Sequence, residues 1–586
     1  MPIGRPCDNL EPGNKCAAAS FHPVAATTPE SEDRPMLRPT PPRTRPCPLG
    51  GSPRLRDGAV GGMAAGWTLA LAWAVGVSAA LAEEHRPQPT APPAAVTQPA
   101  PKAESILLIT IDTLRADRLS GYGYGRPTSP NLDRFMARGT RFEWAFSTAS
   151  YTAPSHISMM TGLYPSFTSV GLDNGRFFKL SGRTMTLAEV CRDAGMRTAA
   201  VISNPTLNRR LGLHQGFAVY RDMQFDRQTG AYNPKIAATT TDEALILLDI
   251  VHNAPFFLWV HYQDPHGPYL PPAMYPELRE TDVPPERDLE LPIGADTSGY
   301  KAIPSYQVVG SERHVGEYSR RYDNEIRYLD SEIQRLLDRV DQLGLLRHTL
   351  VIVTSDHGEA FGEDDYYFAH SHSVDVGQVR VPLAFVGAGV AAGVALQTPA
   401  TVLDIYATAL EALRLAGNAH DSRSLLPALR EGREPPARPI FVESFSQRGV
   451  IAQGTFYRND RRPPESRIWT VSPTTNGHHQ PLGIECRQLL SAEPVPDGLK
   501  ESLRAELDAF SIQAEEAIRT TFEELLAKLK DKRTRAEENG LKFWRDKLGY
   551  PFELEDVGPT EPTLGDEEAA HRKALIGLGY LTDDDD

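Results

Sequence analysis

The chain has 586 residues, of which 40% are hydrophobic and 23% charged, and its formal net charge is −15. These proportions are ordinary for a globular protein and exclude a collagen-like, a fully disordered or a polytopic membrane protein. The acidic balance also argues against nucleic-acid binding, because no surplus of cations is present to displace the counterions of phosphates. Five cysteines are too few for a disulfide-dense scaffold.

The first 103 residues are rich in proline and lack the periodicity of helices or strands, so we expect no folded domain there. Within them, Ala64 to Ala82 form an uncharged run that follows several arginines and ends in Ala-Leu-Ala. A basic stretch, an apolar core and a small-x-small site are typical of a secretory signal peptide. The alternative is a single membrane anchor, since the run is just long enough to span a bilayer. Both interpretations predict an exported protein, periplasmic or extracellular, with membrane contact only if the run is not cleaved.

Composition divides the chain into five parts. They are a disordered or non-native extension (1–62), the signal peptide (63–82), a Pro/Ala-rich linker (83–103), a main folded domain (104–445) and a C-terminal subdomain with a long helix and an acidic tail (446–586). The extension is called non-native because translation could also begin at Met36 or Met63. After the linker only Cys191 and Cys486 remain, and a disulfide between them is compatible with the sequence but not required.

Short apolar runs alternate with amphipathic stretches after the linker. Five runs have the pattern of buried strands: Ser105–Asp112, Arg197–Asn204, Phe256–Tyr262, Thr349–Ser355 and Pro382–Gly387. Arg321–Leu343 carries apolar residues at spacings of three and four, which predicts a helix. This alternation predicts an α/β fold with a large, doubly wound, mainly parallel sheet sandwiched by helices.

Polar side chains follow four of the predicted strands, where sheets of this class place their chemistry. These strand ends carry Asp112, Ser203 and Asn204, Asp264 and His266, and Asp356 and His357. The adjacent carboxylate and imidazole of Asp356 and His357 can ligate one cation, with Asp112 as a further ligand from another strand. For a single Asp at a strand end, the plainer alternative is a helix N-cap.

The segment 151–162, with the sequence YTAPSHISMMTG, holds a candidate nucleophile. We expect Pro154 to open a helix that Ser155 caps, which leaves Thr152 just before a helix N-terminus, where backbone N–H groups favour an anion. A hydroxyl held there on a metal can attack a phosphoryl or sulfuryl centre. The segment alone favours the plainer alternative, in which Thr152 only caps the helix and Ser155 only starts it.

Together these motifs resemble the sulfatase family of the alkaline phosphatase superfamily. The matching segments follow the family's order from about residue 104 to 445; they are 112–124, 130–134, 152–165, 264–269, 354–359 and 380–383. The resemblance implies a metal held by Asp112, Asp356 and His357, with Thr152 at the position of the nucleophile. The second aspartate that the family usually carries beside the first is here Thr113.

The resemblance also implies residues around the substrate. His266 is similar to the family's histidine near the anion, and His370 or His372 falls where another histidine or lysine contacts substrate oxygens. A solvated loop is the alternative for the last two. The residues predicted to bind an anionic ester substrate are therefore His266, His370 and His372, together with Asn204 and Asp264 from the strand ends.

Position 152 argues against the formylglycine chemistry of sulfatases. Formylglycine arises from Cys or Ser in a Cys/Ser-x-Pro-x-Arg frame, whereas this chain has Thr152 and, in place of the arginine, His156. The methyl group on the threonine Cβ prevents oxidation to an aldehyde. Superfamily relatives that act on phosphate esters use a plain Thr or Ser alkoxide. We therefore predict an exported metal-dependent hydrolase of phosphate or sulfate esters, phosphate favoured, with Thr152, His156 and His266 as catalytic residues and no formylglycine.

The histidines of the predicted site favour zinc or manganese, although calcium and magnesium are compatible. A second metal between Asp264, His266 and a downstream histidine is also compatible with the sequence. Two other functions remain open. One is a transferase that passes a phospho-headgroup from a lipid through Thr152, and the other is a protein with a degraded site, suggested by Thr113 and His156, that binds an anionic glycan or partner without turnover.

The C-terminal part predicts a small sheet and a long helix. Gly449–Phe456 has the pattern of a strand, and Leu499–Leu529 carries one apolar stripe. We expect this helix to pack on the main domain; the alternatives are a lid over the pocket or the seam of a homo-oligomer.

Overall fold

The computed structural model describes residues 102–168, 179–223, 225–226, 231–232, 235–272, 289–444, 446–460, 485–488 and 495–529. The predicted extension, the signal peptide, nearly all of the linker and the acidic tail lie outside these residues. Among the described helices, none combines the length and the apolar character needed to cross a membrane.

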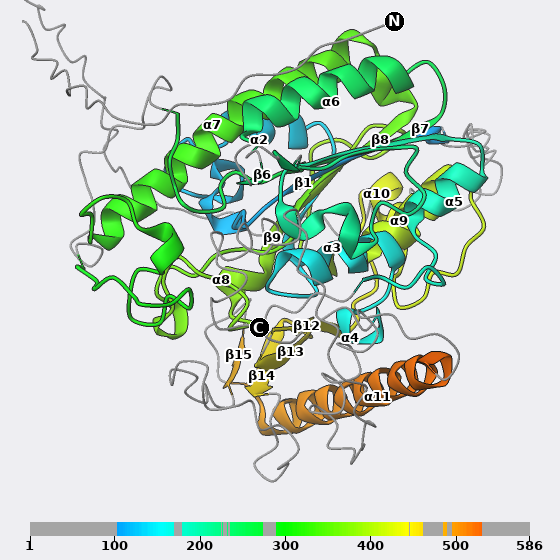
Figure 1. Cartoon of the computed structure of the whole chain (residues 1–586). Helices are drawn as coiled ribbons and strands as arrows, with labels where there is room; N and C mark the ends of the chain where they lie inside the picture. The colour runs from blue at the N-terminus through cyan, green and yellow to red at the C-terminus, as the bar shows by residue number, and fades with distance from the viewer. Residues whose placement is uncertain are drawn as a thin grey trace, which may run out of the picture. The chain divides into compact units, whose positions relative to one another are not determined.

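A nine-stranded sheet forms the centre of the described fold (Figure 1). Its order is β10-β2-β9-β8-β1-β7-β3-β4, with β11 paired to β2. The strands from β8 to β4 in this order are parallel, and β9 runs antiparallel to both of its neighbours. The bounds are β1 (Ser105–Ile111), β2 (Thr140–Phe146), β3 (Arg197–Ile202), β4 (Val219–Arg221), β7 (Phe256–Tyr262), β8 (Thr349–Ser355), β9 (Arg380–Val386), β10 (Val394–Leu396) and β11 (Ala400–Thr401). The predicted mainly parallel sheet is confirmed, and β7 and β8 have exactly the predicted bounds.

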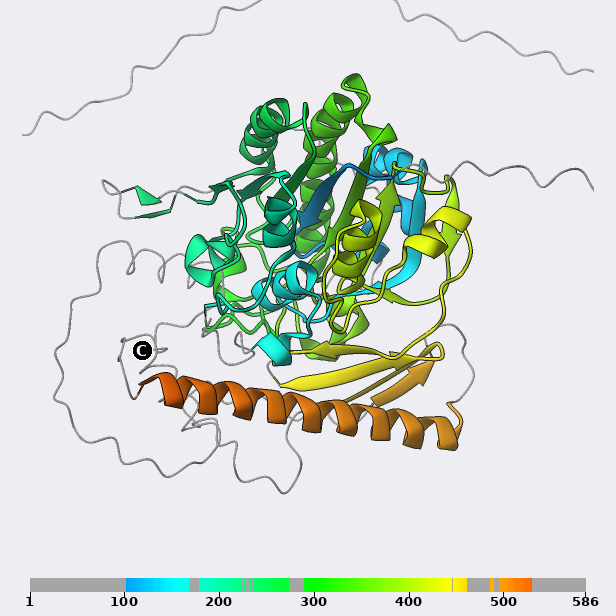
Figure 2. The same cartoon turned by 90° about the vertical axis from the view of Figure 1, so that its right-hand side faces the viewer.

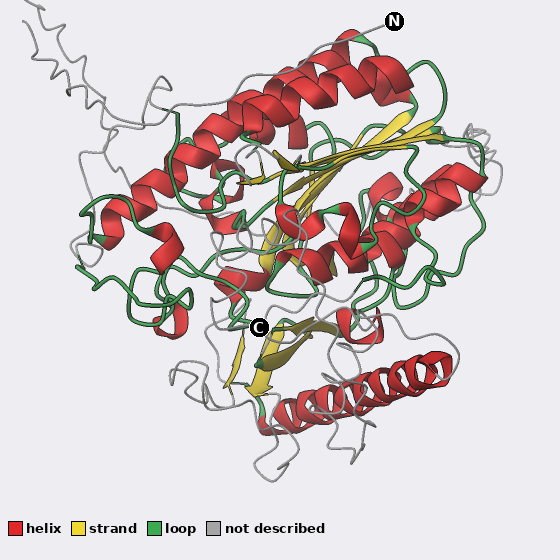
Figure 3. Cartoon of the chain, in the orientation of Figure 1, coloured by secondary structure: helices red, strands yellow, loops and turns green. Residues whose placement is uncertain are grey.

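Helices cover both faces of the sheet because successive strand side chains point to opposite sides. In β1, Ile106 and Leu108 enter one core, whereas Leu107 and Ile109 enter the other. The first core contains α3 (Thr152–Thr161), α5 (Leu187–Asp193), α9 (Asp404–Leu413) and α10 (Leu426–Glu431), and the second contains α2 (Pro130–Met136), α6 (Ala237–Val251) and α7 (Val315–Gln342). Figure 3 shows the two helical layers on either side of the sheet. The helix predicted from Arg321 begins earlier, at Val315.

A four-stranded antiparallel sheet follows, made of β12 (Ile440–Glu443), β13 (Gln447–Ala452), β14 (Thr455–Asp460) and β15 (Glu485–Gln488). The prediction of one strand over Gly449–Phe456 is wrong, because a hairpin turn at Gln453 and Gly454 divides this segment. Both turn residues have positive φ, 49° and 71°, as a two-residue type I′ hairpin turn requires. The sheet begins with β12, before the predicted boundary at 446.

The long helix α11 (Asp497–Leu529) lies along this second sheet (Figure 2). Leu503 and Leu507 pack on Val450 and Tyr457. Phe510 stacks on Phe441 with ring centroids 4.2 Å apart, and it also meets Tyr164, which precedes the short helix α4 (Pro165–Thr168). The helix therefore packs on the folded body through β12, β13 and α4, as we expected. The disulfide that the sequence allowed is not formed, since Cys191 is a free, buried thiol.

Candidate active site

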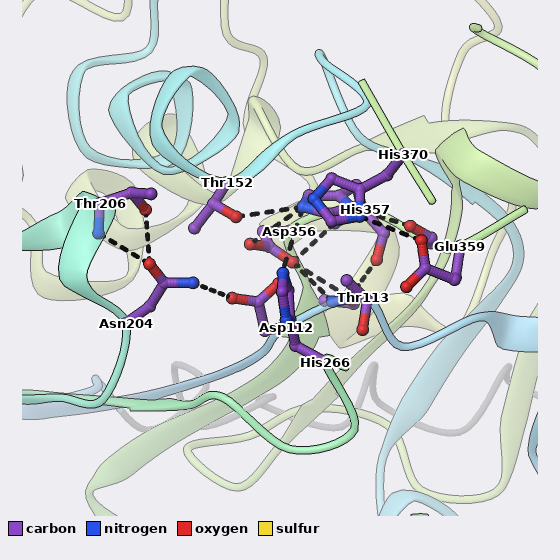
Figure 4. Close-up of polar contacts among 12 residues, drawn as sticks. Asp112, Thr113, Thr152, Asn204, Thr206, His266, Asp356, His357, Glu359 and His370 are labelled. Carbon is purple, nitrogen blue, oxygen red and sulfur yellow. Dashed lines mark hydrogen bonds and ion pairs between the residues drawn. The ribbon is translucent and has the colours of Figure 1, made fainter. Parts of the chain in front are cut away.

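The carboxyl ends of β1, β3, β7 and β8 meet at one edge of the sheet, as the sequence predicted. In the parallel register Ile111 lies opposite both Ser355 and Tyr262, so the residues that follow these strands come together. Asp112 follows β1, and Asp356 and His357 follow β8. Thr152, the first residue of α3, faces them from the helical layer (Figure 4). All four residues are fully buried.

Three of these residues form a cluster of metal-ligating groups. Ligand atoms of Asp112, Asp356 and His357 all lie within 4.8 Å of one another. His357 Nε2 is 3.7 Å from Asp112 Oδ1, 3.7 Å from Asp356 Oδ2 and 3.2 Å from Thr152 Oγ1. One cation can therefore contact two carboxylates, an imidazole and a hydroxyl at this place.

The hydrogen bonds of the cluster leave its inner atoms as electron-pair donors. His357 Nδ1–H donates to the Gly358 carbonyl at 2.8 Å, so the neutral ring directs the lone pair of Nε2 into the cluster. Asp112 Oδ1 and Asp356 Oδ2 meet no hydrogen-bond donor in the described part of the chain. Buried acceptors that face one another without a donor are costly. A divalent cation satisfies all of them, so these residues fit the metal that the family resemblance implies.

The electrostatics of the cluster lead to the same conclusion. Burial, together with the charge of Asp112, raises the pKa of Asp356 to about 7. Burial also raises the pKa of Asp112, and it lowers the pKa of His357 to about 4. In each case burial disfavours the charged form. A bound cation supplies the positive charge that the two carboxylates need in order to remain ionised.

Helix α3 starts two residues earlier than predicted. Thr152 is its first residue and Tyr151 its N-cap, whereas Pro154 and Ser155 lie inside the first turn. The predicted cap by Ser155 is therefore wrong; its hydroxyl is buried without a partner among the described residues. The physical reason is that Tyr151 is already extended (φ −158°, ψ 161°), so the chain turns helical directly after it. Thr152 thus lies at the positive end of the helix dipole, not ahead of it.

His156 lies one helical turn after Thr152 in α3 and contacts Asp356 of the cluster. Its Nδ1–H donates to the Thr152 carbonyl at 2.8 Å, and Nδ1 also lies 3.6 Å from Asp356 Oδ2. Burial lowers the pKa of His156 to about 3, so the ring is neutral and Nε2 accepts a hydrogen bond from the Thr110 hydroxyl at 3.1 Å. His156 therefore braces the backbone of Thr152 and faces Asp356.

His261 belongs to the site and was not predicted. The single proton of the Thr110 hydroxyl goes to His156, so the same oxygen accepts from Trp259 Nε1 (2.9 Å) and from His261 Nδ1 (3.1 Å). This leaves the lone pair of His261 Nε2 3.5 Å from Asp112 Oδ2. The signal was present in the sequence, because in β7 His261 alternates with Val260 and Tyr262 and so shares the face of Trp259, toward α3.

Asn204 contacts the cluster directly, at the end of β3. Its Nδ2 donates to Asp112 Oδ2 at 2.6 Å, while its Oδ1 accepts from the backbone N–H and the hydroxyl of Thr206 (Figure 4). The bonds to Thr206 fix which end of the amide faces Asp112. Asn204 therefore orients the carboxylate so that Oδ1 points into the cluster.

His266 and His370 lie beside the cluster, as predicted. Their ring centroids are 5.1 Å apart, and His370 lies 4.5 Å from His357. His266 Nδ1–H donates to the Gly267 carbonyl at 2.8 Å, and His370 Nδ1–H donates to Glu359 Oε1 at 3.0 Å. Burial lowers the pKa of both rings, that of His370 to about 3.

Two predicted residues are not part of this group. Asp264 shares the α6–α7 side of the sheet with Tyr262, and the nearby Glu325 of α7 contributes to its environment; burial raises its pKa to about 6. The predicted role of Asp264 in binding substrate, or a second metal with His266, stays a prediction. His372 stacks on Tyr366, with ring planes 4° apart, because Ser371 between the two histidines has a left-handed φ of 77° and turns the chain.

Thr113 occupies the place of the aspartate that the family usually carries. It has a φ of 56°, which is rare for a β-branched residue and typical of functional sites. Its N–H donates to Asp356 Oδ1 at 3.3 Å, and its carbonyl accepts from Tyr322 Oη at 2.7 Å. Its hydroxyl is buried without a partner among the residues described.

Comparison with known families agrees with this geometry. A family model described as Sulfatase matches residues 104–415, which is more than half of the chain. The chain belongs to the sulfatase family. The match includes β1, α3, β7 and β8, and so contains every residue of the cluster.

Sulfatase relatives extend the comparison. Human iduronate 2-sulfatase is 27% identical over 332 residues, which cover 48% of this chain and 59% of that protein. The multifunctional alkaline phosphatase superfamily protein PehA of Trinickia caryophylli is 26% identical over 431 residues, 59% of this chain and 81% of that protein. The crystal structure of a phosphonate monoester hydrolase of Agrobacterium radiobacter shares the fold, with a TM-score of 0.50 and 18% sequence identity. The superposition covers 70% of this chain and 96% of that one.

Proposed function

We propose that this sulfatase-family chain is an exported, metal-dependent hydrolase of phosphate or sulfate esters, with Thr152 as the nucleophile and phosphate esters as the favoured substrates. The observation that carries the proposal is the position of the Thr152 hydroxyl. It lies at the N-terminus of α3, 3.2 Å from His357 Nε2 and beside two buried carboxylates. The anionic substrates are in keeping with the names of the relatives, which include a sulfatase and a multifunctional member of the alkaline phosphatase superfamily.

Asp112, Asp356, His357 and Thr152 would hold the cation, and zinc or manganese suits a set that contains imidazole nitrogen. When bound, a divalent cation lowers the pKa of a hydroxyl and draws charge from an ester oxygen. The threonine methyl group excludes formylglycine at position 152. The nucleophile is therefore a plain Thr152 alkoxide. We favour phosphate esters over sulfate esters as the substrates that it attacks.

The chain's own residues supply the rest of the reaction. Thr152 Oγ1 forms a bond to phosphorus as the bond to the leaving oxygen breaks, and water later cleaves the Thr152 ester. The first turn of α3 directs its dipole at the transferred group and stabilises its negative charge. His156, one helical turn further along α3, fixes the backbone of Thr152 by donating a hydrogen bond to its carbonyl. We expect His266 and His370, whose rings lie beside the cluster, to contact the ester oxygens.

The test uses the full chain, recovered from the exported fraction, with its bound metals measured by mass spectrometry. We would assay p-nitrophenyl phosphate, bis-p-nitrophenyl phosphate and p-nitrophenyl sulfate in parallel for the wild type and Thr152→Ala. Thr161→Ala is the matched control, because Thr161 is equally buried on α3 and its hydroxyl bonds only backbone groups, donating to the Ile157 carbonyl and accepting from the Leu163 N–H.

We expect phosphoester turnover that Thr152→Ala abolishes and Thr161→Ala retains. Turnover of the sulfate ester in preference to both phosphate esters would overturn the preference for phosphorus. Turnover that survives in Thr152→Ala would overturn the role of Thr152. A metal-loaded wild type that turns over none of the esters would favour the binding-protein alternative.

A further inference from the structure

Glu359 is a buried carboxylate next to the proposed site, and the proposed mechanism does not yet use it. Oε1 accepts the hydrogen bond from His370 Nδ1, and Oε2 accepts one from Tyr269 Oη, each at 3.0 Å. Glu359 is fully buried, as is Tyr269. Both oxygens thus have fixed partners, and the carboxylate is locked in one orientation.

The neighbouring guanidinium of Arg115 bonds the backbone of Glu359. Arg115 Nη1 donates to the Glu359 backbone carbonyl at 2.8 Å, and the side chain forms its ion pairs with Asp117 and Glu363. Arg115 thus holds the backbone of Glu359, whereas His370 and Tyr269 hold its carboxylate. A buried carboxylate that accepts the Nδ1 proton of a histidine fixes its tautomer and orientation, and it stabilises the imidazolium when the ring gains a second proton.

The orientation of His370 follows from this bond. With Nδ1 turned to Glu359, Nε2 lies on the opposite side of the imidazole ring. The ring lies 4.5 Å from His357, whose Nε2 is in turn 3.2 Å from Thr152 Oγ1. In Figure 4, Glu359 and Thr152 lie on opposite sides of the histidine rings.

We propose that Glu359 is a positioning residue that makes His370 the proton carrier of the reaction; this inference rests on the proposed function. Before the attack, the hydroxyl proton of Thr152 moves to His370. This transfer gives a Thr152 alkoxide and a protonated His370 and leaves the total number of protons unchanged. In the first half, the Thr152 Oγ1–phosphorus bond forms, the bond from phosphorus to the leaving oxygen breaks, and that oxygen takes the proton from His370 Nε2. In the second half, a water proton returns to His370 as the water oxygen bonds to phosphorus and the Thr152 ester breaks.

The decisive variant is Glu359→Gln, which keeps the size of the side chain and removes its charge. Its kcat/KM would be measured for aryl phosphates of increasing leaving-group pKa, from p-nitrophenyl to phenyl phosphate. A proton donor matters most for poor leaving groups, so we expect a loss of about 100-fold for phenyl phosphate and less than about 5-fold for p-nitrophenyl phosphate. Glu363→Gln is the matched control and should lower all rates equally, if at all. An equal loss across the series in Glu359→Gln would overturn the inference.

A second measurement needs no turnover. Histidine labelled with nitrogen-15 reports by NMR which ring nitrogen carries the proton, and His370→Gln assigns the signal. We expect a proton on Nδ1 of His370, strongly deshielded in the wild type and in Glu363→Gln, and shifted upfield in Glu359→Gln. A proton on Nε2, or a signal unchanged in Glu359→Gln, would overturn the inference. Turnover that survives in Thr152→Ala would contradict the proposed function alone, since the spectrum still reports on Glu359 and His370.

Discussion

The Thr152 hydroxyl and the His357 imidazole lie 3.2 Å apart, although 205 positions separate them in the sequence. The first begins helix α3, and the second follows strand β8. Because the Gly358 carbonyl binds Nδ1–H of His357, the other ring nitrogen has only a lone pair to offer. The hydroxyl therefore lies beside the three groups that would hold the cation, where a metal can activate a nucleophile.

The side-chain oxygen at position 152 should decide activity. We expect Thr152→Ala to lower kcat/KM for a phosphate ester by at least about 1,000-fold, because the reacting atom is removed. Thr152→Ser keeps that atom and should stay within about 10-fold of the wild type. Steady-state kinetics of both variants, with metal content measured, provide the check. Equal losses in the two variants would mean that the methyl group, not the oxygen, is what the site needs.

Asn204 should control metal affinity without contacting the metal. Asn204→Ala removes the 2.6 Å hydrogen bond to Asp112 Oδ2 and lets that carboxylate rotate. Loss of such a supporting bond typically weakens metal binding by about 10- to 100-fold. The measurement is a competition titration against a chelator. Asn208→Ala is the control, since Asn208 only caps the next turn by accepting from the Arg210 N–H; a similar loss there would contradict the prediction.

Asp356 should make the metal-free protein sensitive to pH. Its pKa is raised to about 7 in the folded state from an ordinary value of 3.8. Below about pH 4 the group is protonated in the folded and the unfolded chain, so it costs nothing. As the pH rises to about 7, the unfolded chain ionises freely whereas the folded chain resists, and folding stability falls. The full penalty above pH 7 is at most about 4 kcal/mol.

Asp356→Asn tests this directly. In metal-stripped protein, the variant should gain stability over the wild type as the pH rises from about 4 to about 7, and the gain should then level off. With metal present the order should reverse, because only the wild type binds the ion tightly. Urea unfolding at several pH values measures both effects. A difference between the two proteins that does not change with pH would contradict the assignment.

The contact of α11 with β12 should contribute substantially to the free energy of unfolding. Phe510 is 5% exposed and stacks on Phe441, whereas Ile512 is 66% exposed on the same helix. Phe510→Ala should cost about 3 kcal/mol by leaving a cavity. Ile512→Ala, the matched control, should stay within about 0.5 kcal/mol of the wild type. Denaturant unfolding compares the two; equal effects would mean that α11 is not anchored through Phe510.

Much of the site could be predicted from local sequence. Asp112, Asp356 and His357 follow buried strands, and parallel strands bring their carboxyl ends to one edge. The positions of other predicted residues depend on conformations that spacing does not determine. The left-handed Ser371 separates His370 from His372, and Asp264 lies near Glu325 of α7.

The residues that were missed have a similar explanation. His261 lies inside an apolar strand, and its role depends on Thr110, whose hydroxyl is shared with His156 in the folded protein. Glu359 follows the Asp356-His357 motif but acquires its partner, His370, only through the loop that folds back over it. The hydrogen bond that reveals His261 joins segments 151 positions apart, whereas the one that reveals Glu359 spans 11 positions and depends on the path of the loop between them.

The central claim is that Thr152 carries the transferred group during turnover. The most direct measurement is to mix the metal-loaded enzyme with a phosphate ester, quench in acid within the first turnover, and locate the modification by peptide mass spectrometry. We predict one phosphoryl group on the peptide that contains Thr152, assigned to that residue by fragmentation, and none in Thr152→Ala. A phosphoryl group on another residue, or rapid turnover with no covalent intermediate in the quenched wild type, would contradict the account.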